Sequence, residues 1–400
     1  MSRPLIAHSP DLRRLAEEGY EFEIRDGLLL VHHVPYVNET REVKLGTLVS
    51  TLVLAGDVTT TPETHTVHFI GEKPCDEQGR VLTGVVHSSG RQTLADGVEV
   101  DHMFSSKPAP TSEAPAGYRD YHEKLTSYIN MLLGPAQALD PSASAQTFQG
   151  GNETESDSVF VYSENASVRA GIGGATQKLK IDRVAIIGLG GTGAYIFDLL
   201  AKTPISEIHL FDGDVFLQHN AFRSPGAATI EELRQLLPKV IYLRDRYAPM
   251  RRGIIAHPAP ITENNVEGLR EMDFVFLALD HGPSRKLIIE RLEAWDRSFI
   301  DVGMGLGSTD GDSIEGLVRV TTSTPSQRRH VWDNGQVPFG EPDPNNIYER
   351  NIQVADLNML NAVLAVIKFK KLVGFYVDLE REHTTFYGID VNDLVNEDKG

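Results

Sequence analysis

The stretch that decides the fold runs Val184-Ala185-Ile186-Ile187-Gly188-Leu189-Gly190-Gly191-Thr192-Gly193. Its four leading apolar residues are typical of a short buried strand, and a helix is predicted from Gly193 to Lys202. In such a turn Gly188 permits the sharp bend, Gly190 lets backbone approach a phosphate, and Gly193 lets the helix pack on the strand. Free N–H groups at the start of the helix would bind the anion. The motif therefore predicts a nucleotide site.

Strands and helices alternate along the chain beyond this turn. Further strands are predicted at Glu207–Phe211, Gly253–His257, Asp273–Leu279, Ser298–Val302, Leu317–Thr322 and Thr384–Ile389. Helices are predicted at Glu231–Arg246, Ser284–Trp295 and Val354–Phe375. This alternation predicts an α/β fold with a Rossmann-like, doubly wound and mostly parallel sheet.

The glycine turn alone does not identify which nucleotide-dependent reaction the protein catalyses. Asp212 ends the next predicted strand, about 20 residues on, where a carboxylate would bind the ribose hydroxyls of a nucleotide. A glycine turn followed by such an acid most often marks an enzyme that uses NAD or FAD. An NAD(P)-dependent oxidoreductase and a non-catalytic nucleotide-binding module are therefore two alternative readings.

The residues that follow Asp212 favour a third reading. In order along the chain they are Phe211-Asp212-Gly213-Asp214-Val215, Asn220-Ala221-Phe222-Arg223, Pro238-Lys239, and Leu279-Asp280 with Arg285. Together with the glycine turn, this series resembles the ThiF/MoeB and ubiquitin-activating enzyme family over residues 177–322. The resemblance implies an adenylyltransferase that uses ATP and Mg²⁺ to activate the C-terminal carboxylate of a small protein, releasing pyrophosphate.

The resemblance also implies roles for individual residues. It implies that the nucleotide is bound by the turn glycines Gly188, Gly190, Gly191 and Gly193, together with Asp212 and Asp214. It implies that the phosphates are bound by Asn220, Arg223 and Lys239, and that magnesium is bound by Asp280. The chemistry agrees, because arginine bridges phosphate oxygens, lysine supplies a point charge, and magnesium prefers carboxylate oxygen. Arg223, Lys239 and Asp280 are accordingly the predicted catalytic residues.

Partners follow from the same resemblance. It implies a ubiquitin-like or sulfur-carrier protein that ends in glycine, a conjugating or sulfur-transfer partner that receives it, and a homodimer. In such a dimer Arg169 is a candidate for the arginine that reaches the partner subunit's ATP site.

Cys75 is the single cysteine, so it is the one internal candidate for a thioester. The competing interpretation is a small buried hydrophobic residue. The neighbouring acids Glu72 and Asp76 would raise the thiol pKa and oppose reactivity.

The chain before the glycine turn reads as a separate, smaller domain. Residues 1–145 are predicted to be an α+β domain, residues 146–165 a linker rich in small polar residues, and residues 166–400 the adenylation domain. Within the first domain, Thr64–Gly71 and Val81–His87 are predicted to form a hairpin, and Tyr118–Leu133 a helix. Phe104–Pro108 and Asp120–Lys124 resemble an uncharacterised domain that precedes some bacterial ThiF-like domains. Docking of a partner or substrate is its expected role.

Composition excludes some classes of partner. The net charge of −18 over 400 residues argues against non-specific binding to nucleic acid or to an anionic membrane. The longest apolar segment, Val363–Val377, is interrupted by lysines and too short to span a bilayer. The predicted location is cytoplasmic.

Overall fold

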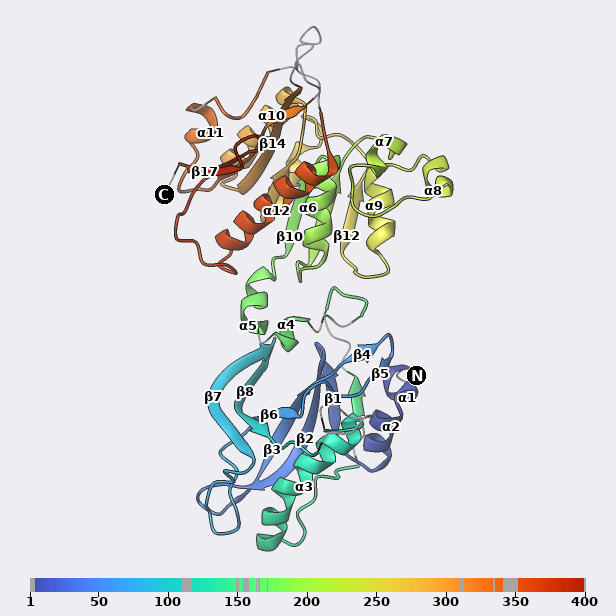
Figure 1. Cartoon of the computed structure of the whole chain (residues 1–400), viewed down its shortest axis with the longest axis vertical. Coiled ribbons are helices and arrows are strands. Elements are labelled where there is room, and N and C mark those ends of the chain that lie inside the picture. The colour runs from blue at the N-terminus through green and yellow to red at the C-terminus, as the bar shows by residue number, and fades with distance from the viewer. Residues whose placement is uncertain are drawn as a thin grey trace. The chain divides into compact units, whose positions relative to one another are not determined.

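The computed structural model describes residues 4–109, 117–148, 151–153, 158–162, 164, 166–170, 172–308, 313–333, 335–340 and 352–398. The chain divides into two compact units. The first comprises Met1–Ser158 and Tyr162–Gln177, and the second comprises Val159–Val161 and Lys178–Gly400. Both units combine helices with a β-sheet (Figure 1).

The first unit is built on a seven-stranded sheet with strand order β7-β8-β6-β3-β2-β1-β9. Its strands are β1 (Phe22–Arg25), β2 (Leu28–Val37), β3 (Val43–Thr51), β6 (Thr66–Ile70), β7 (Val86–Ala95), β8 (Val98–Ser105) and β9 (Gly151–Glu153), and a separate pair is formed by β4 (Leu54–Ala55) and β5 (Val58–Thr59). Its helices are α1 (Pro4–His8), α2 (Pro10–Glu17), α3 (Tyr121–Leu139), α4 (Ala166–Arg169) and α5 (Gly173–Thr176). Helix α3 packs on the sheet and buries Leu125, Tyr128 and Ile129.

The predicted hairpin between Thr64–Gly71 and Val81–His87 is wrong. Strand β6 pairs with β3 and β8, and β7 begins only at Val86. Val67 and Phe69 of β6 are fully buried in the core under α3. A strand buried in this way needs a neighbour on each side, and the chain supplies them from distant segments.

The first unit extends past residue 145, where its end was predicted. Phe148 N–H donates to the Gly19 carbonyl at 3.0 Å, and β9 pairs in parallel with β1. The small polar residues after Asp140 therefore do not mark the point at which the chain divides, which lies between residues 158 and 178.

The second unit is built on an eight-stranded sheet with strand order β12-β11-β10-β13-β14-β15-β16-β17. Parallel pairing joins β10 (Arg183–Ile187), β11 (Glu207–Phe211), β12 (Ile254–His257), β13 (Phe274–Leu277) and β14 (Ser298–Ser308). Antiparallel pairing then adds β15 (Ile314–Ser323), β16 (Thr384–Gly388) and β17 (Asp393–Glu397). The mostly parallel α/β sheet predicted from the sequence is confirmed.

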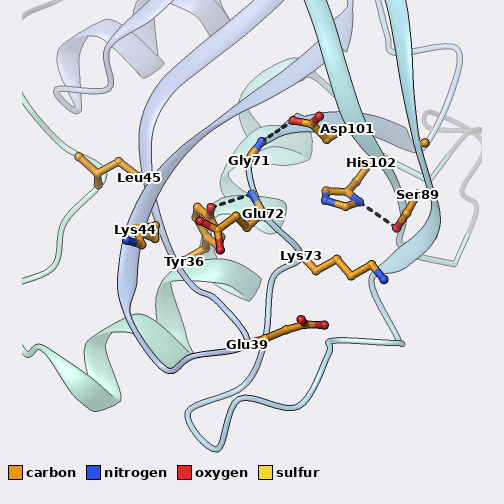
Figure 2. A pocket seen from close by; sticks show the side chains of 11 residues that line it. Tyr36, Glu39, Lys44, Leu45, Gly71, Glu72, Lys73, Ser89, Asp101 and His102 are labelled. Carbon is orange, nitrogen blue, oxygen red and sulfur yellow. Dashed lines mark hydrogen bonds between the residues drawn. The ribbon is translucent and has the colours of Figure 1, made fainter.

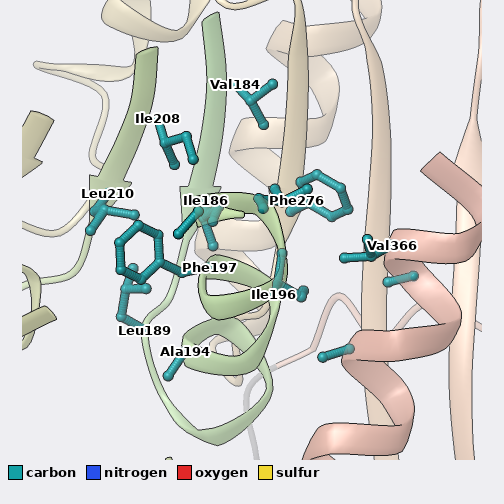
Figure 3. Packing of buried hydrophobic residues seen from close by; sticks show 14 of the residues in the cluster. Val184, Ile186, Leu189, Ala194, Ile196, Phe197, Ile208, Leu210, Phe276 and Val366 are labelled. Carbon is teal, nitrogen blue, oxygen red and sulfur yellow. The ribbon is translucent and has the colours of Figure 1, made fainter. Parts of the chain in front are cut away.

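Helices cover both faces of this sheet. The helical segments are η1 (Gln177–Leu179), α6 (Gly191–Ala201), α7 (Gln218–Ala221), α8 (Ile230–Arg234), α9 (Lys239–Tyr247), η2 (Val266–Glu271), α10 (Gly282–Ala294), α11 (His330–Asp333) and α12 (Ala355–Leu372). On one face, α6 and α12 pack against each other and bury Ile186, Phe197 and Val366 (Figure 3). On the other, α10 and η2 bury Val275, Ile288 and Leu269. Among the described residues, no helix has the length and apolar character needed to cross a membrane.

The single helix predicted over Glu231–Arg246 is instead two helices. Between α8 and α9, Leu236 adopts a left-handed backbone (φ +51°) and Pro238 precedes α9 as its N-cap. Proline removes a backbone donor and clashes with the preceding helical turn, so it ends one helix and starts the next. The break places Lys239 at the first turn of α9, where its backbone is free to pair outside the helix.

Candidate nucleotide site

The glycine turn connects β10 to α6 at the carboxyl edge of the parallel strands. Gly188 has φ +89° and donates its N–H to the Phe211 carbonyl at 2.9 Å. A Cβ at Gly188 would lie 2.3 Å from the Ala278 carbonyl oxygen, and a Cβ at Gly193 would lie 1.8 Å from the Gly188 carbonyl oxygen. Both positions therefore require glycine. A Cβ at Gly190 would meet nothing within 4 Å, so the tip of the turn borders open space.

Asp212, at the end of β11, braces this turn. One of its carboxylate oxygens accepts the Leu189 N–H at 2.7 Å, and the other accepts the Asp214 N–H at 2.8 Å. The side chain is buried, with 9% of the residue exposed. Asp212 therefore ties the glycine turn to the segment that follows β11.

Lys239 completes this cluster from α9. Its Nζ lies 2.7 Å from Asp214 Oδ2 and 3.5 Å from the Asp212 carboxylate, although Lys239 is only 6% exposed. Two carboxylates thus compensate one buried ammonium group. The sequence brought Asp212, Asp214 and Lys239 into one predicted site, and the structure brings them into contact.

Asn220 and Arg223 lie in and just after α7, which follows Asp214 along the chain. Asn220 Oδ1 accepts the Leu217 N–H at 2.9 Å, whereas its Nδ2 is buried and has no hydrogen-bond partner among the described residues. The buried Nε of Arg223 likewise has no hydrogen-bond partner among the described residues. A buried donor needs an acceptor, and a bound ligand or a water molecule can supply it.

Asp280 follows β13 and has an exposed side chain. The adjacent Leu279 carbonyl accepts a hydrogen bond from Arg285 Nη2, and Arg285 also pairs with Asp301 at 3.0 Å. Asp301 pairs in turn with Arg319 at 2.6 Å, and all three charged side chains are buried. Arg285, which entered the sequence motif without an assigned role, therefore anchors the loop that carries Asp280.

Sequence reasoning missed Asn358 of α12. Its Oδ1 accepts a hydrogen bond from Thr192 Oγ1 at 2.8 Å, across 166 residues of sequence. A Cβ at Gly191 would lie 2.1 Å from Asn358 Nδ2, so the amide rests directly on that glycine. No local motif marks Asn358, because its role arises only when α12 packs on α6.

Two further predicted residues, Arg169 and Cys75, belong to the first unit. Arg169 ends α4 in the first unit, and its side chain is outside the described residues. Cys75 is 1% exposed and packs with Val37 and Ala136. Burial, together with Glu39 and Asp76, raises the pKa of the Cys75 thiol. These are the properties of an unreactive thiol and argue against the predicted thioester role.

A polar cavity of about 840 Å³ lies in the first unit (Figure 2). Three carboxylates, those of Glu39, Glu72 and Asp101, line it with the amines of Lys44 and Lys73. Its wall is fixed by hydrogen bonds, since Glu72 N–H donates to Tyr36 Oη at 2.8 Å and Gly71 N–H donates to Asp101 Oδ2 at 3.0 Å. The residues that line the cavity belong to the first unit, and the predicted nucleotide-site residues belong to the second.

Comparison with known proteins agrees with this division. Residues 162–325 match the ThiF family, and residues 10–165 match a domain of unknown function, DUF6791. No curated protein sequence matches the chain.

Solved structures resemble part of the chain. They include E. coli MccB (16% identity, TM-score 0.47, covering 60% of this chain and 71% of that chain) and PaaA (16% identity, TM-score 0.45, covering 58% and 71%). A third is E. coli MccB solved with AMPCPP and MccA (17% identity, TM-score 0.47, covering 60% and 73%). Likeness at this level does not define a substrate for this chain. The family matches show that the chain carries a ThiF-family domain over residues 162–325, preceded by a DUF6791 domain over residues 10–165.

Proposed function

We propose that the chain is an ATP-dependent adenylyltransferase that activates the C-terminal carboxylate of a peptide-like or protein substrate. The observation that carries the proposal is the direct linkage of the glycine turn to Lys239 through Asp212. The dinucleotide-binding motif consists of the glycine turn and an acid, and a lysine beside them is not part of it. A triphosphate, in contrast, brings negative charge that a lysine at this position would balance.

In the proposed reaction, an oxygen of the substrate carboxylate attacks the α-phosphorus of ATP. A bond forms between that oxygen and the α-phosphorus. The bond between the α-phosphorus and the oxygen that bridges it to the β-phosphorus breaks, and pyrophosphate leaves. The carboxylate is already ionised at neutral pH, so no general base is required. Catalysis then consists of positioning two anions and stabilising the charge that develops on the phosphates.

The unpartnered donors support this assignment. Asn220 Nδ2 and Arg223 Nε are buried without acceptors in the described part of the chain, and the resemblance had given both residues to the phosphates. Phosphate oxygens would supply the missing acceptors. Lys239, already placed between two carboxylates, would exchange part of that pairing for phosphate when ATP binds.

Magnesium fits the residues around the site. Asp280 offers an exposed carboxylate at the end of β13, and it is the residue that would hold the ion. When bound, magnesium would neutralise charge on the departing pyrophosphate. The chain's own contribution is Arg285, which fixes the Leu279 carbonyl and thereby the position of Asp280.

The finer part of the proposal concerns the substrate. A ubiquitin-like or sulfur-carrier protein ending in glycine would present a flexible tail with an unhindered carboxylate. The adenylate would then pass to a conjugating or sulfur-transfer partner, because Cys75 is buried and the chain has no other cysteine. We also propose a homodimer, in line with the family resemblance.

For the first unit we propose a docking role for the protein substrate. Glu39, Glu72 and Asp101 outnumber Lys44 and Lys73 in the cavity, so a positively charged segment of the substrate fits it best. In the full chain, Glu39→Lys is expected to raise the KM for the substrate while leaving ATP affinity unchanged. An unchanged KM would remove this cavity from the proposal.

The decisive experiment is ATP–pyrophosphate exchange with candidate small proteins that end in Gly-Gly. Exchange is expected only when ATP, Mg²⁺ and the correct small protein are all present. Binding of NADH without binding of ATP would favour the oxidoreductase alternative. Tight ATP binding with no exchange for any candidate would favour a non-catalytic module.

A further inference from the structure

The amino end of α6 presents a set of donors that have no acceptor inside the helix. The first intrahelical hydrogen bond runs from Ala194 N–H to the Gly190 carbonyl at 3.0 Å. The N–H groups of Gly191, Thr192 and Gly193 therefore have no acceptor within α6. Because α6 has 11 residues, its amino end also carries the positive end of a helix dipole.

A side chain from a distant helix adds to these donors. Asn358 of α12 is 1% exposed, and its Nδ2 has no hydrogen-bond partner among the described residues. The Thr192 hydroxyl donates to Asn358 Oδ1 and holds the amide in one orientation. In that orientation Nδ2 lies directly beside Gly191, the first residue of α6.

This arrangement is costly unless an anion completes it. The Asn358 NH₂ group and the N–H groups of the first turn of α6 are all donors, and α6 supplies no acceptor for them. A buried donor without an acceptor costs about 1–3 kcal/mol in a folded protein. The neighbouring Gly190 borders open space, so there is room for a ligand at the tip of the turn, next to the first residue of α6.

We infer that Asn358 is a phosphate-binding residue, and that its Nδ2 and the amino end of α6 together bind one phosphate group of the nucleotide. The inference rests on the proposed use of ATP, and it adds a contact from α12 that the sequence motif does not contain. It also explains Gly191, since any side chain there would displace the Asn358 amide. Asn358 binds the ligand directly in this view and does not serve only to pack α12 on α6.

A matched control exists one turn further along α12. Asn361 is also 1% exposed, and its Nδ2 donates to the Gly303 carbonyl at 2.9 Å. Replacing either asparagine by leucine removes a buried amide of similar size from the same helix. The structural cost of the two replacements should be similar, whereas only Asn358 faces the amino end of α6.

The test measures binding of ATP and of adenosine to the full chain by calorimetry, for wild type, N358L and N361L. Loss of one charge-assisted hydrogen bond predicts that N358L binds ATP about 10- to 100-fold more weakly. Its adenosine affinity should stay within about 3-fold of wild type, because adenosine has no phosphate. N361L should bind both ligands within about 3-fold of wild type.

Three outcomes would overturn the inference. ATP affinity in N358L that equals wild type would leave Asn358 as a packing residue, and so would an equal loss of ATP and adenosine affinity. If wild type binds no ATP, the proposed function fails and the inference fails with it. Circular dichroism and thermal melting check folding, and N358S replaces N358L if the larger side chain does not fold. Its shorter hydroxyl does not reach the amide position, so the same loss of ATP affinity is expected.

Discussion

Lys239 Nζ lies 2.7 Å from Asp214 Oδ2, and the backbone N–H of Lys239 donates to the Asp214 carbonyl at 2.9 Å. The lysine is thus held at two points before any nucleotide binds. The Asp214 side chain is 76% exposed, whereas the lysine side chain is only 8% exposed. An exposed acid can turn away when phosphate arrives, and the buried lysine stays in place.

Replacing this lysine should therefore slow the nucleotide chemistry strongly. Lys239→Met is expected to lower ATP–pyrophosphate exchange by about 10²–10³-fold, the effect of losing one preorganised electrostatic group. Lys202→Met is the control, because Lys202 is exposed and, within the described residues, its ion pair is with Asp198, one turn earlier on α6. Exchange rates in Lys239→Met that match the control would remove Lys239 from the site.

Asp280 provides a second test of the same site. Asp280→Ala is expected to lower exchange by about 10²–10³-fold while the protein stays folded, because the side chain is exposed. Exchange and urea unfolding are measured on the same preparation. Glu290→Ala, an exposed acid on α10, should leave both unchanged. An Asp280→Ala protein with full exchange would contradict the magnesium role.

Cys75 should prove dispensable for chemistry. Since the thiol is 1% exposed and burial raises its pKa, a thiol-reactive chromogenic disulfide should not label it in the native protein. Labelling should appear on unfolding in guanidinium. Cys75→Ala should keep its exchange activity and lose about 1 kcal/mol of stability from a small cavity. Rapid labelling of Cys75 in the native protein would restore the thioester hypothesis.

The parts of the fold that the sequence predicts are those set by local pattern. Strand β11 begins and ends where it was predicted, at Glu207 and Phe211, because a short, mostly apolar run lies between the Pro204 segment that follows α6 and the polar segment that begins at Asp212. Asp212 could be assigned for the same reason, since it directly follows the last residue of that strand. Carboxyl ends of parallel strands meet at one edge, so strand ends predict which side chains share a site.

The parts that escaped prediction depend on pairing across long stretches of sequence. Asn358 and Thr192 are 166 residues apart, and neither carries a signal that names the other. Arg285 could be seen as part of a motif, but its contact with Asp301 requires α10 to be packed on β14. Strand β9 is three residues long and lies in a segment of linker-like composition. It is a strand because it pairs with β1, and its own sequence does not indicate this.

Arg251 offers a test of the second unit's core. It is 1% exposed, and its guanidinium donates to the carbonyls of Leu200, Ala201, Thr203 and Ile205, at and beyond the carboxyl end of α6. Burial lowers the pKa of Arg251 to about 10, so it remains charged at neutral pH. A cation at a helix carboxyl end satisfies the last carbonyls and the negative end of the dipole.

Arg251→Met should therefore cost about 2–4 kcal/mol, because several buried carbonyls lose their donor. Arg252→Met is the neighbouring control, since Arg252 is exposed and should change stability by less than about 0.5 kcal/mol. Urea unfolding followed by circular dichroism measures both. Equal stability of the two variants would show that water replaces the guanidinium.

Lys124 gives the first unit a pH dependence of known sign. Its Nζ is fully buried between α3 and the sheet and donates to Ser50 Oγ at 3.0 Å, and it forms no ion pair within the described part of the chain. Burial lowers the pKa of Lys124 from 10.5 to about 7. Between pH 7 and 10.5 the unfolded chain therefore binds a proton that the folded chain does not bind, so this residue makes stability rise with pH across that range.

Replacing Lys124 by methionine should remove this dependence. Lys124→Met is expected to be more stable than wild type at pH 6–7, by on the order of 4 kcal/mol, because no ammonium group is then buried. The difference should shrink steadily towards pH 10, where the unfolded lysine also begins to lose its proton. Urea unfolding of wild type and Lys124→Met at pH 6, 8 and 10 gives the free energy of unfolding of each protein. The difference between the two values at each pH is compared, because the contributions of all other titrating groups then cancel. A difference that is constant with pH would mean that Lys124 keeps its ordinary pKa in the fold.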